Sequence, residues 1–591
     1  MKMFYLATSR CSLLAVLLLA LGIHSSEAGS AKWRPSPTNN DWNTATNWQP
    51  ATVPNGPSDS ARFSVSNTTS ISISANTEVS AIQFLPGASV FAISPNLAIT
   101  LTLSGTGIIN NSGVTQNLVT SSDEAGNFAL INFTNNATAG SLTTVTNNGP
   151  GGSHMEGQTQ FFDTSRAGNA VIINNSSTVS GFFGGIARFF DNSTGDHGTF
   201  INNGATIDGT DGGQTQFSDN ASAGIANITT NGATVPGGAA DTYFFGTATA
   251  ASATLTNNAG GITGDGGFTF FEDSFTAGSA ILISNGATLA GAGGGTTSFM
   301  GTSSAGASTI IANGATNGGA PGDLFFFDNS TGATARIELL GNGIMDISTH
   351  QLPGVTIGSI EGTGVAELGG NNLTVGSSNR STTFSGVLQD GGQGGGTGGS
   401  LTKIGSGTLT LAGSNTYTGA TTVNGGTLLI KRAAGSGTGT GTVQINSGTL
   451  GGTGTIAGVT NVGTTPDMGA ILSPGLNGLG ALTIRGLLTF VNATVFKFEI
   501  NSSTGNADRV IAKGVSIVGF STFAVFSLVD LGNGTLAPGS VITVINNTAP
   551  TPFGGTFTNL PDGGTLTVGN NTYQADYQGG DGNDLTLTVE P

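Results

Sequence analysis

Residues 158–175 read QTQFFDTSRAGNAVIINN, and residues 214–231 read QTQFSDNASAGIANITTN. Both stretches belong to a series of similar copies that runs from about residue 121 to residue 345. One position recurs at intervals of 27 or 28 residues, and its occupants are Asn148, Asn175, Asn203, Asn231, Asn258, Asn285, Asn313 and, in the eighth copy, Leu340. A fixed period of about 20 to 50 residues is typical of repeat architectures.

Two further positions of each copy show which side of the chain is buried. Three residues before the anchor asparagine the side chain is always apolar: Val145, Ile172, Phe200, Ile228, Leu255, Leu282, Ile310 and Ile337. Five residues before it the side chain is always small: Thr143, Ala170, Gly198, Ala226, Ala253, Ala280, Ser308 and Ala335. Positions two residues apart lie on the same face of a strand. The pattern therefore predicts an all-β, right-handed parallel β-helix, with coils of 27 to 28 residues stacked about 4.8 Å apart.

An aromatic column and an acidic column accompany the strands. We expect an aromatic stack along the axis from Phe133, Phe162, Phe190, Phe217, Phe245, Phe271, Phe299 and Phe327. Twelve residues before the anchor stand Asp163, Asp191, Asp219, Asp273 and Asp328, with Asn136, Gly246 and Gly301 in the other copies. Glycine follows the anchor in most copies, and the Asn-Gly pair suits the tight corner of a coil.

The composition narrows the class of protein. The chain has 591 residues, of which 98 are glycine and only 8% are charged, and its net charge is −17. Strong helix formers are scarce, so the chain should be nearly all β. The acidic balance argues against nucleic acid as a partner, because phosphate binding requires a basic surface.

The first 28 residues predict export. Lys2 and Arg10 precede an apolar core of signal-peptide length, and Ser26 to Ala28 offer small residues for cleavage. The only cysteine, Cys11, would be removed with this segment, so no disulfide is expected in the mature chain. We expect the mature protein outside the cell or on its outer surface, without a transmembrane segment.

The remaining chain divides into five predicted parts. Residues 29–63 hold Trp33, Trp42 and Trp48, which form either a cap over the first coil or a platform for stacking carbohydrate. Residues 64–390 form the solenoid, and the Gly-rich segment 391–400 is a linker or a loop between two coils. Residues 401–480 and 481–591 form a second repeat region and a C-terminal β-module that caps the rod.

The second repeat region carries a specific motif. Residues 401–430 read LTKIGSGTLTLAGSNTYTGATTVNGGTLLI. They resemble the autotransporter-associated β-strand repeat, which occurs in secreted passenger proteins of Gram-negative bacteria. The resemblance implies a parallel β-helix that is displayed or released outside the cell and has no enzymatic activity. We expect the chain to lack the C-terminal membrane barrel of that family, because no series of alternating barrel strands precedes Pro591.

Two groups of carboxylates are candidate calcium ligands. Asp163, Asp191 and Asp219 lie on successive coils, where a cation would relieve the repulsion between neighbouring charges. Asp581 and Asp584 lie in GGDGNDL, which matches one copy of a calcium-binding nonapeptide. The alternative interpretations are carboxylates that splay into water and a plain turn before the last strand. No other cofactor is expected.

Three functions are compatible with this pattern. The first is a secreted or cell-surface structural or adhesive rod, with surface polysaccharide or other cell-surface components as partners. The second is an extracellular carbohydrate-binding module that uses the three tryptophans. The third is a polysaccharide-degrading β-helix enzyme, which would require convergent acid and base groups. Neither His154, His197 and His350 nor Arg166 and Arg188 occupy equivalent positions of the repeat, so we predict no catalysis.

Overall fold

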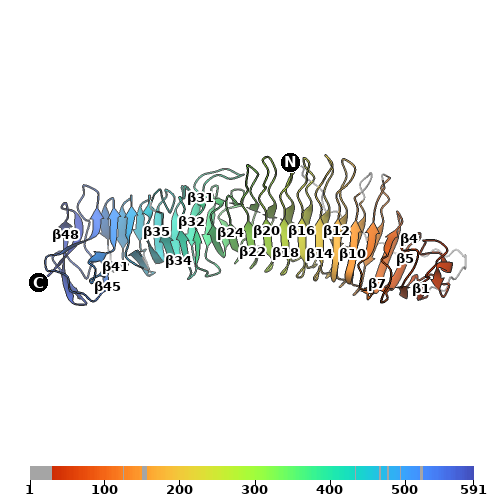
Figure 1. Cartoon of the computed structure of the whole chain (residues 1–591). Helices are drawn as coiled ribbons and strands as arrows, with labels where there is room; N and C mark the ends of the chain where they lie inside the picture. The colour runs from red at the N-terminus through yellow and green to blue at the C-terminus, as the bar shows by residue number, and fades with distance from the viewer. Residues whose placement is uncertain are drawn as a thin grey trace, which may run out of the picture.

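The chain forms an extended rod built almost entirely of β-strands (Figure 1). The computed structural model describes residues 29–123, 125–149, 156–432, 434–464, 468–475, 478–492, 494–518 and 524–591. Within these ranges the only helical segment is a single 3-10 turn, η1 (Ala45–Asn47). The predicted signal segment, residues 1–28, lies outside the described residues.

One long sheet, sheet A, runs along the N-terminal two thirds of the rod. It is parallel throughout except for its first pair, β1 and β2. Its sixteen strands, in spatial order, are β2 (Trp48–Gln49), β1 (Ala31–Trp33), β3 (Gly56–Phe63), β5 (Thr77–Phe84), β7 (Thr100–Asn110), β9 (Leu130–Phe133), β11 (Gln158–Phe161), β13 (Ile186–Phe189), β15 (Gln214–Phe217), β17 (Asp241–Phe244), β19 (Phe268–Phe271), β21 (Thr296–Phe299), β23 (Asp323–Phe326), β25 (Ile344–Asp346), β28 (Val365–Glu367) and β31 (Val387–Gln389).

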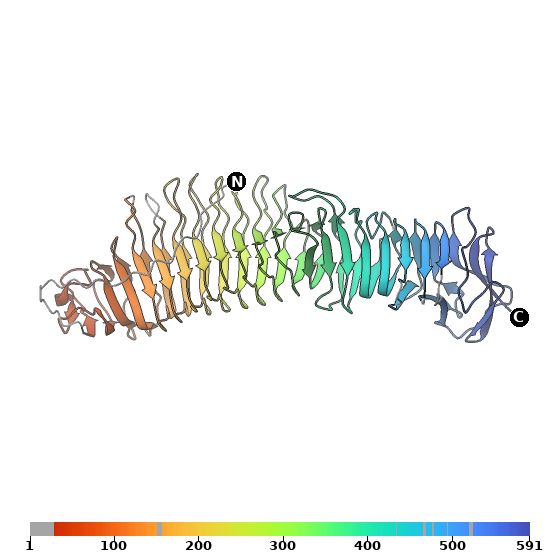
Figure 2. The ribbon, with the colours of Figure 1, turned by 180° about the vertical axis from the view of Figure 1, so that it is seen from behind.

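A second parallel sheet, sheet B, takes one strand from each coil on the other side of the core. Its strands in this part of the rod are β4 (Ser70–Ile73), β6 (Ala92–Pro95), β8 (Gln116–Thr120), β10 (Ser141–Asn147), β12 (Asn169–Asn174), β14 (Thr199–Asn202), β16 (Asn227–Thr230), β18 (Thr254–Asn257), β20 (Ile281–Ser284), β22 (Thr309–Ala312), β24 (Arg336–Leu339) and β27 (Ser359–Gly362). Between the two sheets, loops project from one side of the middle of the rod (Figure 2).

Toward the C-terminus the coils continue as parallel rows. Sheet B carries two rows made of β26 (Gly354–Ile357), β29 (Asn372–Val375), β30 (Thr382–Phe384), β32 (Ser400–Lys403), β33 (Thr408–Leu411), β34 (Thr421–Ile430), β35 (Val443–Gly452), β37 (Thr460–Val462), β38 (Ala470–Pro474), β40 (Leu488–Val491), β41 (Val495–Asn501), β44 (Val515–Val518) and β45 (Val525–Asp530), with β42 (Asn506–Ala507) antiparallel to β41. A further row consists of β36 (Thr455–Ile456), β39 (Ala481–Ile484), β43 (Arg509–Ala512) and β46 (Val541–Asn547).

The rod ends in a mixed sheet. Beyond β46 the pairing becomes antiparallel, through β49 (Asp584–Val589), β48 (Asn571–Gly579) and β47 (Thr565–Val568). Parallel stacking therefore passes residue 480, where the sequence pattern placed the start of the C-terminal module. The antiparallel strands lie across the last coils and cover their open edge (Figure 1).

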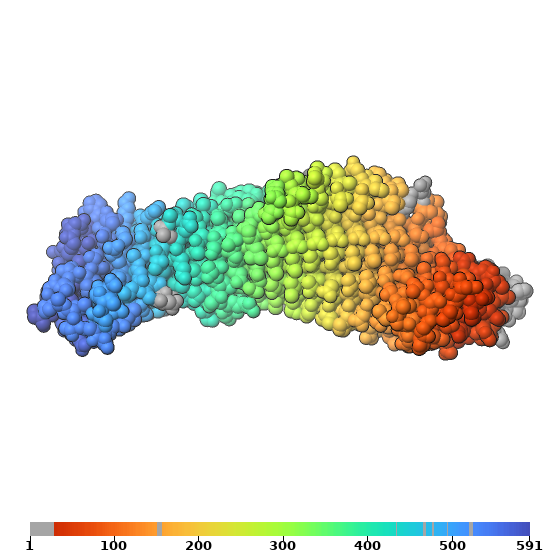
Figure 3. Space-filling view, viewed as in Figure 1, coloured from red at the N-terminus to blue at the C-terminus, as the bar shows by residue number. Residues whose placement is uncertain are grey.

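Adjacent coils pair in register at the repeat interval. Ile172 pairs with Phe200 in sheet B, and Phe161 pairs with Phe189 in sheet A. Every residue of the predicted apolar and small columns is buried. The predicted parallel β-solenoid is confirmed. In the space-filling view, successive parts of the chain form successive bands along the rod (Figure 3).

The aromatic stack is real, but half of the predicted residues were wrong. The buried stack consists of Phe133, Phe161, Phe189, Phe217, Phe244, Phe271, Phe299 and Phe326, with ring centroids 4.4–5.1 Å apart. Phe162, Phe190, Phe245 and Phe327 each follow an inward phenylalanine directly, so they lie on the outer surface and are only half-buried. Phe162 and Phe190 make their own stack there, 5.0 Å apart.

The three tryptophans form the N-terminal cap. Trp33, Trp42 and Trp48 are fully buried, and Trp48 lies 5.0 and 4.9 Å from the rings of the other two. They pack against Phe63 of the first coils, and each indole N–H donates to a backbone carbonyl. This burial is compatible with a cap over the first coils. The carbohydrate platform is wrong, because none of the three rings is exposed to a ligand.

The Gly-rich segment 391–400 is a loop within one continuous solenoid. Its flanking strands belong to stacked coils, since β29 pairs with β32 across it. The Asp390 carboxylate accepts the backbone N–H groups of Gly398 and Gly399, and Asp346 accepts that of Gln393. These hydrogen bonds hold the loop against the rod. No helix in the described ranges is long and apolar enough to cross a membrane.

Candidate functional site

The anchor asparagines form a ladder of side-chain amides along the rod. Each Nδ2 donates to the Oδ1 of the asparagine one coil before it: Asn175 to Asn148 (2.9 Å), Asn203 to Asn175 (2.9 Å), Asn231 to Asn203 (3.1 Å), Asn258 to Asn231 (2.8 Å), Asn285 to Asn258 (2.9 Å) and Asn313 to Asn285 (2.8 Å). Stacked identical amides satisfy one another when strands are parallel and in register. The ladder is half-buried at the corner where each sheet B strand ends.

A second, internal ladder lies one residue earlier. Asn147 donates to Asn174, and Asn174 donates to Asn202, each over 2.8 Å, and all three side chains are fully buried. The threonines of sheet A complete these hydrogen bonds, for example Thr215 to Asn202 over 2.8 Å. This internal ladder was not predicted from the sequence. The sequence does contain a pattern that indicates it, namely the Asn-Asn pairs at 147–148, 174–175 and 202–203. The two members of such a pair lie on different faces of the strand, so one of them points inward.

A groove follows the outer ladder for four coils. Its volume is about 630 Å³. Its lining residues are Asn148, Gly149, Asn175, Ser176, Thr178, Asn203, Gly204, Thr206, Asn231, Gly232 and Thr234. None of them is charged, in a chain whose net charge is −17. A groove lined by amides, hydroxyls and backbone is suited to a ligand that is polar and uncharged.

The acidic column has a structural use. Asp163, Asp191, Asp219, Asp273 and Asp328 all adopt the left-handed backbone conformation, with φ between 51° and 57°. Each carboxylate that faces a preceding coil accepts a backbone N–H there, as Asp163 does from Asn135 (2.8 Å) and Asp191 does from Asp163 (3.1 Å). The equivalent residue of the first copy is thus Asn135, and the predicted Asn136 was wrong.

This geometry explains which residues occupy the column. Asparagine, aspartate and glycine are the residues that tolerate positive φ, and they fill every copy. Asp163, Asp191 and Asp219 lie on successive coils, as predicted, and each exchanges hydrogen bonds with its neighbour's backbone. Among the residues that the structure describes, no group of three or more acidic, histidine or cysteine side chains is arranged to hold a metal ion.

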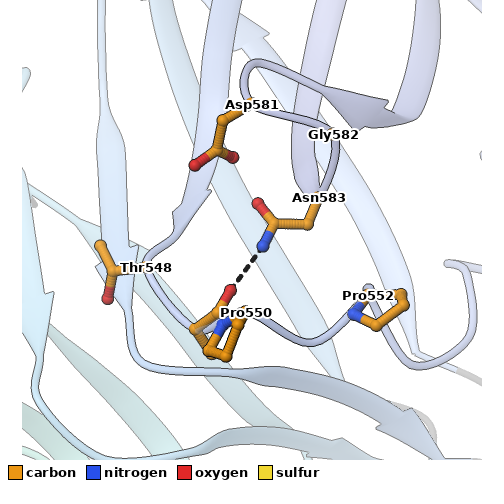
Figure 4. A pocket seen from close by; sticks show the side chains of 7 residues that line it. Thr548, Pro550, Pro552, Asp581, Gly582 and Asn583 are labelled. Carbon is orange, nitrogen blue, oxygen red and sulfur yellow. Dashed lines mark hydrogen bonds between the residues drawn. The ribbon is translucent and has the colours of Figure 1, made fainter.

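The two C-terminal calcium candidates, Asp581 and Asp584, lie in different surroundings. Asp581 lines a pocket of about 450 Å³ with Thr548, Pro550 and Asn583 (Figure 4). Asp584 is instead buried, and its Oδ1 accepts the N–H of Asn547 over 2.8 Å. Burial raises the pKa of the Asp584 carboxyl. The turn joins two antiparallel strands, β48 and β49, so the two carboxylates belong to a hairpin.

The outer face of sheet A gathers partly buried carboxyl groups. Burial and the nearby charge of Asp211 raise the pKa of Asp241 to about 7. On β23, burial with the charges of Glu367 and Asp346 raises the pKa of Asp323 to about 7. Tyr243 lies beside Asp241 and stacks on Phe270 at 5.0 Å.

The described cations and histidines considered for catalysis are dispersed, and His154 lies outside the described residues. Arg188 donates to Glu156, Gln158 and Gln216 at 2.9–3.1 Å on the outer face of sheet A. His197 contacts Asp196 at 2.7 Å on an exposed corner, and Nε2 of His350 contacts the Ser330 carbonyl at 2.7 Å. These contacts lie on different coils, and none of them joins a nucleophile to a base.

Residues 401–430 form part of the continuous stack. β32 and β33 pair with the two halves of β34, and β34 pairs with β35 of the next coil. Three motif residues are buried inside these coils: Lys403, Asn415 and Tyr417. Asn415 accepts the N–H of Leu388 in the preceding coil (2.8 Å) and donates to Gly437 in the following one (2.6 Å).

Residues 401–430 match the passenger-associated-transport-repeat. This match confirms the resemblance drawn from the motif, and it covers those 30 residues of the chain. The chain is also similar to the crystal structure of the Haemophilus influenzae Hap adhesin, at 11% sequence identity and a TM-score of 0.34. That similarity covers 90% of this chain and 64% of the adhesin chain. No curated protein matches the chain significantly.

The passenger repeat contains a buried lysine. Lys403 is 1% exposed, and its Nζ donates to the carbonyls of Ile404 (2.6 Å), Gly405 (3.2 Å) and Gly425 (3.3 Å). Gly425 belongs to the next coil, so the ammonium group joins two turns of the repeat. Burial lowers the pKa of Lys403 to about 8.

We expect a rise in stability above pH 8 that depends on Lys403. Between about pH 8 and pH 10 the unfolded chain holds this proton and the folded chain releases it, so the free energy of unfolding increases with pH. The increase should be on the order of 2 kcal/mol, and Lys403→Met should abolish it. Urea unfolding at pH 8, 9 and 10 measures the effect. Lys431→Met, at an exposed lysine of the same repeat region, should leave the increase intact.

Proposed function

We propose that this chain is the passenger-type rod of a secreted protein, and that it acts on the cell surface as a structural or adhesive element. The observation that carries the proposal is the passenger repeat at residues 401–430, stacked in one solenoid with the coils before and after it. The proposal assigns no reaction to the chain.

The rod has physical properties that suit exposure outside a cell. Parallel stacking pairs the backbone groups of each coil with those of its neighbours, so few are left open to a protease. Trp33, Trp42 and Trp48 cover the first coils, and the antiparallel strands β47, β48 and β49 cover the last ones. Exposed strand edges are sites of aggregation, and both ends of the rod are protected in this way.

Surface exposure of the whole chain tests this proposal. An epitope can be inserted between Gly237 and Gly238 on a projecting loop, where both residues have positive φ and the Cβ position of Gly237 is open. We expect antibody to label this epitope on intact cells, and external protease to remove the label. A matched variant carries the epitope at Asn147, a fully buried residue of the internal ladder, and should be destabilised and unlabelled.

Attachment is measured separately from location. Cells that display the chain should adhere to surfaces or to one another more than cells from which its gene is deleted. Epitope retained inside the cell would contradict the surface assignment. Surface display with no change in attachment would leave the rod on the surface and remove the adhesive role.

A further inference from the structure

The groove along the outer ladder repeats one set of chemical groups on each coil. Its first column is the ladder itself, with Asn175, Asn203 and Asn231. Three residues after each of these stand Thr178, Thr206 and Thr234, which are exposed. Because successive coils lie about one strand spacing apart, roughly 4.8 Å, the groove offers an amide and a hydroxyl at regular intervals along the rod axis.

The ladder leaves hydrogen-bonding capacity on its amides. An asparagine side chain has two N–H donors and two acceptor lone pairs. In the ladder Asn203 donates one N–H to Asn175, and one lone pair of its Oδ1 accepts an N–H of Asn231. One donor and one acceptor therefore remain on each rung. Among the described residues the Thr206 hydroxyl has no hydrogen-bond partner, and that of Thr234 donates only to the Ala205 carbonyl, 3.3 Å away.

Aliphatic side chains follow the hydroxyl column. Val179, Ile207 and Val235 come directly after the three threonines, and Ile207 is 44% exposed. These three aliphatic residues are next to the groove in sequence but are not among its lining residues, which carry donors and acceptors and no charge. A sugar ring has the complementary chemistry, with hydroxyl groups at its edge and C–H groups on its faces.

We propose that this groove binds an extended, uncharged polysaccharide that runs parallel to the rod axis across four coils. The inference rests on the proposed surface role and names the class of ligand that the rod would meet there. The spare amide groups of the ladder and the hydroxyl groups of Thr206 and Thr234 bind the hydroxyl groups of the glycan, and the exposed Ile207 side chain offers an apolar contact to its rings. An acidic polysaccharide binds less well, because the groove supplies no cation and the chain carries a net charge of −17.

Affinity electrophoresis of the purified chain, residues 29–591, tests the proposal. The probes are hydroxyethyl cellulose and xyloglucan as uncharged polymers, and alginate as an acidic polymer. We expect at least one uncharged probe to retard the chain and alginate to have a much smaller effect. The triple variant Thr178→Val, Thr206→Val and Thr234→Val removes three hydroxyl groups without changing side-chain shape. We expect it to weaken binding about tenfold or more.

A matched variant controls for the loss of surface hydroxyls. Thr288 and Thr316 occupy the same place in later coils, are exposed, and do not line the groove. The double variant Thr288→Val and Thr316→Val should bind as the wild type does. Circular dichroism should show that both variants keep the wild-type fold.

The possible results separate this inference from the proposed function. Failure of every uncharged probe to bind, equal binding by the triple variant, or equal loss in the control variant would overturn the groove assignment. Preferential binding of alginate would overturn it as well. None of these results bears on surface exposure, which the epitope experiment measures independently. Glycan binding by a chain that stays inside the cell would contradict only the proposed function.

Discussion

Replacing Phe189 by alanine should lower the free energy of unfolding by about 3–5 kcal/mol, the usual cost of deleting a buried aromatic side chain. The Phe189 ring is fully buried between Phe161 and Phe217, at centroid distances of 4.4 and 4.7 Å, and Phe200 meets it edge-on at 5.6 Å. The substitution leaves a cavity at the centre of one coil and removes both stacking contacts.

The neighbouring residue provides a matched control. Phe190 is half-buried on the outer face and stacks on Phe162 alone at 5.0 Å. Phe190→Ala should cost about 1 kcal/mol or less, since the site stays open to water. Urea unfolding of the two variants, followed by circular dichroism, compares them directly. Equal destabilisation would contradict the assignment of the inner and outer columns.

The thermal stability of the rod should rise as the pH falls from 8 to 5. Asp241, Asp323 and Asp508 each have a pKa raised to about 7, with burial as the main cause. In the unfolded chain an aspartate loses its proton near pH 4. Between about pH 4 and pH 7 the folded state therefore holds more protons, and the free energy of unfolding decreases as the pH rises.

One substitution isolates the contribution of Asp241. A shift of three pKa units corresponds to on the order of 4 kcal/mol, so Asp241→Asn should raise stability at pH 8 by up to this amount. At pH 4 it should have little effect, because the native carboxyl is then neutral. Differential scanning calorimetry at the two pH values measures the difference. Asp191→Asn, on an exposed corner of the acidic column, should not reduce the pH dependence. A melting temperature that rises with pH between 5 and 8 would contradict the account.

The repeat could be predicted because residues of the same kind occupy equivalent positions in every copy of the sequence. The apolar and small positions recur at a constant distance from the anchor asparagine. In the structure such a position pairs with the equivalent position of the next coil, as Ile172 does with Phe200. The members of the aromatic column were harder to predict, because Phe161 and Phe162 are adjacent and either could face inward. Counting from the anchor resolves the ambiguity, since the inward phenylalanine stands fourteen residues before it in seven of eight coils.

The candidate site could be predicted only in part. The sequence located the asparagine column but not its hydrogen-bonded ladder, because an amide at a corner can equally face water. The groove depends on eleven residues, two from the first coil and three from each of the next three, which come together only when the four coils are stacked. The tryptophans show the opposite case. From the sequence alone the three tryptophans were compatible with a carbohydrate-binding platform. In the structure they are completely buried against Phe63, as the residues of a cap would be.

Electron spin resonance on spin-labelled cysteine pairs tests most directly whether the coils are stacked in register, on which the ladders, the groove and the proposed role all depend. Residues 29–591 contain no cysteine, so labels can be placed at Thr178, Thr288 and Thr316 without background. Thr288 lies four coils and Thr316 five coils beyond Thr178, so the account predicts mean distances of about 19 and 24 Å. Broad distributions, or distances that do not increase by about one strand spacing per coil, would contradict it.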